Sequence, residues 1–171
     1  FDLNSSLDGK LQAGNRLVWV YEIPSRKNQQ FVDELQVIAE IRDGKNAVDF
    51  WFYFETEQPS AVAEITVRID LEDRSFHGET HLEESAVDHF RRTTSHLENG
   101  VGFEFQPHPD RRLEARADCG EYYAEEEICR NIPHPIEASR GQTAQGDAYS
   151  PGWFTLPVSN TKMAHLAIVV N

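Results

Sequence analysis

The residues best suited to chemistry lie in one short run, Val48 to Glu55, where two kinds of side chain alternate. Successive side chains of a β-strand point to opposite faces. One face of the run would be wholly apolar: Val48, Phe50, Phe52 and Phe54. The other would carry two carboxylates and two aromatic rings with polar tips: Asp49, Trp51, Tyr53 and Glu55. Because such rings stack on flat ligands and carboxylates accept hydrogen bonds, this face is a candidate binding surface for a glycan or a small apolar molecule.

Neighbouring strands would extend this candidate surface. Residues 34–42 and 61–72 alternate in the same way and would place Glu40, Glu64 and Arg68 beside the aromatic rings. Arg68 could donate hydrogen bonds to ligand hydroxyls. Glu40 and Glu64 could flank Trp51 and act as a glycosidase pair, one carboxyl protonated and the other ionised. The structural alternative is a solvated sheet face whose charges pair across strands, or aromatic rings covered by a helix, a loop or a barrel wall.

A second aromatic candidate is Trp153, near the end of a stretch rich in Gly, Pro and small polar residues. We expect residues 130–160 to form a long loop, because few regular elements tolerate this composition. Trp153 could then contact a ligand by covering the mouth of a cavity. The alternative is that it anchors the loop to the core.

Histidines give weak signals for a metal site. His77, Glu79 and His81 would share one strand face, but alternate strand residues are about 7 Å apart, which is too far for a compact site. His165 lies opposite the apolar face of the last strand and could line an interior. The chain has no Gly-rich phosphate loop, no Gly-x-Ser-x-Gly nucleophile motif and no paired Cys motif for zinc. We therefore predict no metal and no cofactor.

The two cysteines, Cys119 and Cys129, are close enough in sequence for a local disulfide. Such a bond, together with a chain that starts at Phe1 and a possible glycosylation site at Asn4, favours an extracellular protein. The alternative is a pair of free thiols in a cytosolic protein.

The pattern of the whole chain predicts one all-β domain over residues 1–171, with residues 1–14 as a polar N-terminal arm. Alternation and turn signals predict eight strands: 16–23, 34–42, 47–56, 61–72, 75–82, 101–106, 112–118 and 162–170. Residues 83–98 would form one short helix, with Ser85 as a possible cap, or an irregular strand. The fold should be an antiparallel β-sandwich of jelly-roll type or a closed β-barrel.

Composition limits the partners. The 171 residues carry 29 Asp and Glu against 16 Lys and Arg, a net charge of −13, which disfavours nucleic acid and anionic membranes. No stretch has the roughly 20 apolar residues that a membrane span requires. A secreted binding domain for a glycan or small apolar molecule is the main prediction. The alternatives are a small β enzyme, a hydrolase, lyase or cyclase with carboxylate or histidine acid–base chemistry, and a secreted protein-interaction factor. The sequence does not indicate the oligomeric state.

Overall fold

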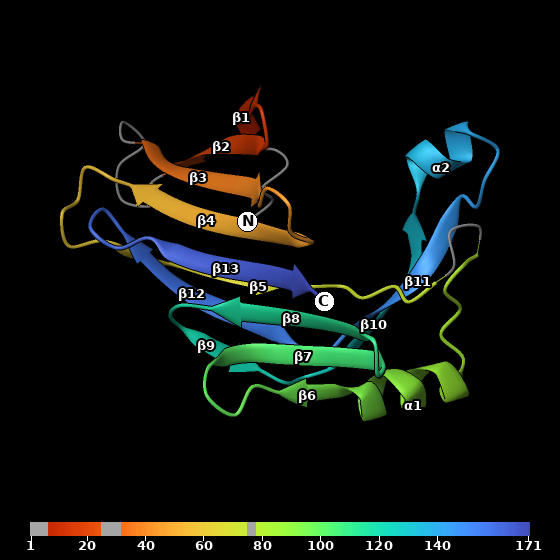
Figure 1. Cartoon of the computed structure of the whole chain (residues 1–171). Coiled ribbons are helices and arrows are strands. Elements are labelled where there is room, and N and C mark those ends of the chain that lie inside the picture. Colours follow the sequence, from red (N-terminus) through yellow and green to blue (C-terminus); the bar gives the residue numbers. More distant parts are fainter. Residues whose placement is uncertain (1–6, 25–31, 75–77) are drawn as a thin grey trace.

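The computed structural model describes residues 7–24, 32–74 and 78–171. In this part of the chain, antiparallel strands form two layers that pack face to face (Figure 1). The larger sheet has two free edges, so it does not close into a barrel over the described residues. The predicted all-β sandwich is confirmed, and the barrel alternative is not formed.

The larger sheet contains eight strands, each antiparallel to its neighbours. Their spatial order is β1 (Leu7–Ala13), β2 (Arg16–Pro24), β3 (Val32–Ile41), β4 (Ala47–Glu55), β13 (Ala164–Val170), β8 (Arg111–Ala117), β7 (Val101–His108) and β6 (Thr94–His96). A tight turn joins β3 to β4, and Gly44 there has a φ of 66°, a conformation that suits glycine. This hairpin was predicted correctly, including its turn.

The second layer is smaller. Three strands form its main sheet, in the order β5 (Val62–Arg68), β12 (Trp153–Ser159) and β9 (Glu121–Tyr123). A separate two-stranded ribbon pairs β10 (Glu127–Pro133) with β11 (Gln145–Ser150). Gly120 leads into β9 with a φ of 87°, and a Cβ there would lie 2.0 Å from the carbonyl oxygen of Thr155. The close approach of β9 to β12 therefore requires glycine at this position.

The core lies between the two sheets and rests on the alternation of β4. Phe52 and Phe54 are buried, with 5% and 7% of their surface exposed, and they belong to the same cluster as the fully buried Phe154 and Leu156 of β12. Tyr53 and Glu55, on the other face of β4, are exposed. The predicted division of β4 into an apolar core face and a polar outer face is confirmed.

The predicted neighbour of β4 on one side was wrong. β5 pairs with β12 over its whole length, and not with β4, so it belongs to the second sheet. The strand also ends at Arg68, short of the predicted residue 72. Alternation shows which residues of a strand face the core, but it does not show which strand lies alongside.

Helix α1 (Glu84–Thr93) occupies the segment that was predicted as a helix or an irregular strand. Val87 and Phe90 face the core, and Phe90 stacks on Phe105 of β7 with ring centroids 5.3 Å apart. Glu83, and not Ser85, is the N-cap residue, and its side chain makes no capping hydrogen bond. The last turn contains two arginines, Arg91 and Arg92, which suit the negative end of the helix dipole.

Three other sequence expectations need correction. Residues 7–13 of the expected arm form β1, the edge strand that pairs with β2. Residues 78–82 of the expected 75–82 strand are not in a strand, and residues 75–77 lie outside the described part. The expected loop 130–160 contains the end of β10, the short helix α2 (Pro135–Ser139), β11 and β12. Its glycines and prolines stand mostly at turns and strand ends, so they do not prevent these elements from forming.

The predicted disulfide is absent, because Cys119 and Cys129 are free in the structure. Cys119 packs against the core cluster just before β9, whereas Cys129 lies in β10 with its thiol 3.8 Å from Asp70 Oδ1. Burial raises the pKa of both thiols, so both stay protonated and unreactive at neutral pH. The extracellular location stays a prediction, without the support of a disulfide.

Phe52→Ala should lower the free energy of unfolding by about 3–5 kcal/mol, because it opens a cavity between the sheets. Tyr53→Ala, one residue further along and on the outer face, should change it by about 0.5 kcal/mol. Urea denaturation monitored by circular dichroism tests both variants. Equal losses would contradict the assignment of the two faces of β4.

Thiol titration of the denatured, unreduced protein should find two free thiols per chain, as the structure shows. A result of no free thiols would mean that the cysteines are oxidised, which would restore the argument for an extracellular protein.

Candidate functional site

The outer face of the larger sheet holds the predicted aromatic surface, at the centre of β3, β4 and β13. Trp51 lies between Ile38 of β3 and His165 of β13, and its ring stacks on the imidazole at 4.0 Å and an interplanar angle of 20°. His165 therefore points outward and does not line an interior, whereas Leu166 on the same strand is buried in the core. The stack covers part of Trp51, which is only half exposed.

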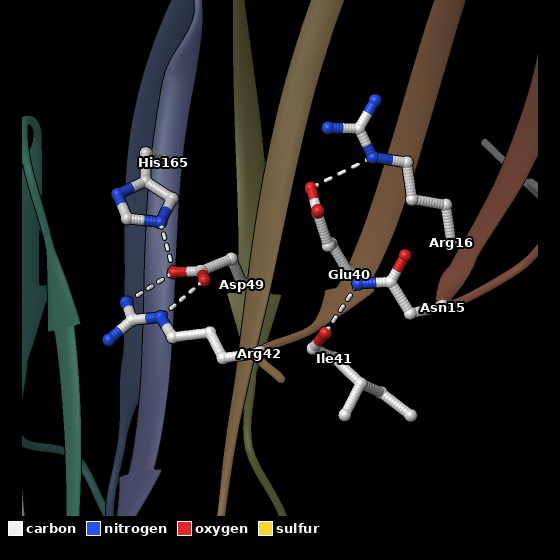
Figure 2. Close-up of polar contacts among 7 residues, drawn as sticks. All are labelled: Asn15, Arg16, Glu40, Ile41, Arg42, Asp49 and His165. Carbon is white, nitrogen blue, oxygen red and sulfur yellow. Dashed lines mark hydrogen bonds and ion pairs between the residues drawn. The ribbon is translucent and has the colours of Figure 1, made fainter. Parts of the chain in front are cut away.

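Asp49 holds the imidazole of this stack, and Figure 2 shows its contacts with His165 and Arg42. Its carboxylate accepts two 2.5 Å hydrogen bonds from the Arg42 guanidinium, and it lies 2.6 Å from His165 Nε2. Although Asp49 is on the outer face, it is only 8% exposed. The hydrogen bonds from Arg42 lower the pKa of Asp49, with His165 adding to the effect, so the carboxylate is ionised at neutral pH.

This geometry changes what Asp49 can do. Both carboxylate oxygens already have charged or polar partners, which leaves little capacity for a ligand. Asp49 instead holds the imidazole of His165 against the Trp51 ring. Alternation in the sequence places Arg42 on the same face as Glu40, two residues further along, but it does not predict that Arg42 pairs with Asp49.

Glu40 and Glu64, the predicted acid–base pair, lie on different sheets. Glu40 is on the outer face of the larger sheet, where it forms an ion pair of 2.9 Å with Arg16 (Figure 2). Glu64 is exposed on β5, whose alternate residues pack against the core from the other side. Since the sandwich lies between the two side chains, they cannot act on one glycosidic bond, and the pair is not supported.

A groove continues the aromatic surface at the end of β4. It has a volume of about 640 Å³ and is lined by Gln36, Tyr53, Phe54, Glu55, Thr56, Ser159, Asn160, Thr161, Lys162 and Met163. Tyr53 and Met163 expose 39% and 46% of their surface, so the groove has an apolar surface among its polar groups. Of the predicted ligand-binding residues, this groove brings together Tyr53 and Glu55.

One side of the groove is the loop between β12 and β13, which sequence reasoning did not connect with β4. Asn160 holds this loop in place: its side-chain oxygen accepts from the Thr56 amide at 2.8 Å, and its nitrogen donates to the Thr56 carbonyl at 2.6 Å. These two bonds link residues 104 positions apart in the chain. No local sequence pattern could have revealed this contact.

Arg68 and Trp153 lie on the outer face of the second sheet, away from the groove. They are paired positions on β5 and β12, and Trp153 stacks on the exposed Tyr123 at 5.8 Å. Arg68 forms ion pairs with Asp70 at 2.9 Å and Glu127 at 2.6 Å. Arg68 therefore does not lie beside Trp51 and Tyr53 as expected, and it forms a separate aromatic patch with Trp153, the second candidate of the sequence.

A strongly apolar cavity of about 340 Å³ lies between β4, β13 and β5. Phe50, Phe52 and Ile168 are among its lining residues, and no carboxylate or histidine is. It is a gap near the edge of the second sheet. It offers no acid–base group, so it gives no support to the alternative of a small β enzyme.

Comparison with known proteins identifies the family of this chain. A family model described as "Glycogen debranching enzyme N terminal" matches residues 15–164, which is most of the chain. The chain belongs to this family. Comparisons with curated proteins and with solved structures gave no match. Of the strands in the described residues, the family match includes all except β1 and β13, and only Ala164 of β13 falls within it.

Two further observations apply to the part of the chain that the structure describes. Neither of its helices is long and apolar enough to span a membrane. No cluster of three or more histidine, cysteine or acidic side chains in that part could hold a metal ion. His81 forms a 2.7 Å pair with Glu79, and His77 lies outside the described residues.

Asp49→Asn should reduce the free energy of unfolding by about 1–3 kcal/mol at neutral pH, because it removes the charge that pairs with Arg42. The folded state depresses the pKa of Asp49, so this contribution is present above the ordinary pKa near 3.9 and is lost as the pH falls through the lower folded value. The difference between the parent protein and Asp49→Asn should therefore shrink below about pH 4.

Urea denaturation at a series of pH values measures this difference. Asp43→Asn, which changes an exposed carboxylate in the β3–β4 turn, is the matched control and should have little effect at any pH. A difference that stays constant down to pH 2 would contradict the assigned ionisation of Asp49.

Proposed function

We propose that the domain binds α-glucan chains such as glycogen, with the groove at Tyr53 as the contact surface. The observation that carries the proposal is the combination in one groove of an exposed Tyr53 ring, the apolar Met163 and polar side chains from β3, β4 and the β12–β13 loop. A sugar ring has an apolar C–H face that stacks on aromatic rings, and hydroxyls at its edge that need hydrogen-bonding partners.

The chemistry of the polar groups supports a glycan over other ligands. Gln36, Glu55 and Lys162 together offer amide, carboxylate and ammonium groups, which can both donate and accept hydrogen bonds. Gln36 also donates to Glu34 at 2.5 Å, which helps to orient its amide. An open groove on a rigid sheet suits a chain that passes along the surface, because it does not have to enclose a chain end.

Charge and family narrow the class of glycan. The net charge of −13 disfavours anionic polysaccharides and has no comparable effect on a neutral glucan. The family to which the chain belongs takes its description from glycogen debranching enzymes, which act on a neutral α-glucan. The role we propose is to hold the polysaccharide, and the domain's own residues carry out no bond cleavage.

The contacts of Asp49 are a further argument for ligand binding next to Tyr53. By fixing His165 on Trp51, Asp49 gives the centre of the sheet a rigid aromatic floor next to Tyr53. A preorganised surface loses less conformational entropy when the ligand binds. Trp51 would then contribute through its exposed edge and by supporting Tyr53.

Tyr53→Ala should weaken binding of glycogen and of linear maltooligosaccharides about 10- to 100-fold, since it removes the stacking ring and its buried apolar area. Isothermal titration calorimetry with maltoheptaose measures the effect. Tyr123→Ala is the matched control, because it removes an equally exposed tyrosine from the second sheet and should leave affinity unchanged.

Two outcomes would overturn the proposal. No binding of glycogen or maltoheptaose by the parent protein would exclude the function itself. Binding that is lost in Tyr123→Ala and kept in Tyr53→Ala would move the glycan surface to the Trp153–Tyr123 patch.

A further inference from the structure

A third and smaller pocket lies at the opposite end of the larger sheet from β1. It has a volume of about 270 Å³, between the edge strand β6 and the second layer. Its lining residues are Arg91, Thr94, Ser95, His96, Phe103, Tyr122, Ala124, Glu126, Tyr149 and Pro151. In the larger sheet, β8 and β7 separate β6 from β13, so this pocket is distinct from the groove at Tyr53.

Two hydroxyl groups at this pocket are buried and lack a hydrogen-bond partner among the described residues. They are Thr94 Oγ1 and Tyr122 Oη, and both are inaccessible to solvent. They come from different layers, because Thr94 lies on β6 and Tyr122 on β9. Buried polar atoms in native proteins nearly always have a partner, so two such atoms at one pocket indicate a site for a hydrogen-bonding molecule.

The pocket wall combines these hydroxyls with aromatic rings. The Tyr122 ring packs on Phe154 at 4.9 Å and on Phe103 at 5.6 Å, and His96 meets it edge-on at 5.4 Å. A Cβ at Gly152 would lie 2.0 Å from the Tyr123 carbonyl oxygen and 2.9 Å from Tyr122 Oη, so the close packing beside this hydroxyl requires glycine. Burial raises the pKa of Tyr122 well above its usual range, which keeps the hydroxyl neutral and able both to donate and to accept.

The charged groups at the pocket neutralise one another. Arg91 Nε lies 2.8 Å from Glu126 Oε2, and Tyr149 donates to the same carboxylate oxygen at 2.9 Å. The hydrogen bonds from Arg91 lower the pKa of Glu126, so this pair is ionised at neutral pH. The pocket therefore carries no unpaired charge from this pair that would favour an anion or a cation.

We propose that this pocket binds one neutral polyhydroxylated ring of hexose size, with Thr94 and Tyr122 as hydrogen-bonding groups. Drug-sized ligands fill pockets of roughly 300–1,000 Å³, so a volume of about 270 Å³ suits a single ring. The Tyr122 and His96 rings supply apolar contact for the C–H groups of such a ring. The site does not depend on glycan binding at Tyr53.

Titration of the ¹⁵N-labelled protein with glucose and with methyl α-glucoside, followed by amide chemical shifts, tests the proposal. Saturable shifts should appear for residues of β6 and β9. Tyr122→Phe and Thr94→Val each remove one uncommitted hydroxyl with little change of shape, and each should weaken this binding about 3- to 10-fold. Both variants should fold, because neither removes a hydrogen bond that the described residues make.

Tyr123→Phe is the matched control, because the neighbouring hydroxyl bonds to Glu121 and not to the pocket. It should leave the affinity for both sugars unchanged. Tyr53→Ala should also keep the shifts at β6 and β9, which separates this site from the glycan groove. The proposal is overturned if these amides show no saturable shift up to the solubility of the sugar, or if Tyr122→Phe and Thr94→Val bind as the parent does.

Discussion

The packing of β4 against β12 is the constraint on which the rest of the structure depends. Phe52 and Phe54 can reach the core only if every second residue of β4 faces inward, and this fixes the register of the larger sheet. A shift of one residue would bury the carboxylates and expose the phenylalanines. The same register puts Trp51 beside His165 and Tyr53 at the groove, so the core determines which side chains face a ligand.

Asp49 shows how a charge on an outer face can become structural. Its carboxylate is shielded by Arg42 and His165, and the bidentate geometry with Arg42 compensates for part of the lost hydration. The cost of burying one charge is thus met by two partners that themselves remain partly exposed. The consequence is a rigid centre on the sheet, while Tyr53, two residues away, remains open to solvent.

Local patterns in the sequence predicted the hairpin of β3 and β4, the faces of β4 and the all-β class, because side-chain alternation is a local property. The pairing of β5 with β12 and the contact of Asn160 with Thr56 depend on the path of the whole chain, and no local pattern encodes them. Glu40 and Glu64 were therefore placed on one surface although the core separates them. The Gly- and Pro-rich region of β11 and β12 was misjudged because composition outweighed the alternation of Phe154, Leu156 and Val158.

At both proposed sites, several charged side chains are already paired with one another, and this supports a neutral sugar as the ligand. Near the Trp51 surface, Asp49, Glu40 and Arg42 are already in ion pairs, and at the small pocket Arg91 and Glu126 pair with each other. The groups left for a ligand at the small pocket are aromatic rings and hydroxyls, whereas the groove at Tyr53 offers its aromatic ring, the Gln36 amide, the Glu55 carboxylate and the Lys162 ammonium. At the small pocket a charged ligand would compete with the Arg91–Glu126 ion pair, whereas a neutral sugar needs only the hydroxyls and rings. The two proposed sites differ mainly in volume, about 640 Å³ for the groove and about 270 Å³ for the pocket, and therefore in the length of sugar chain that they suit.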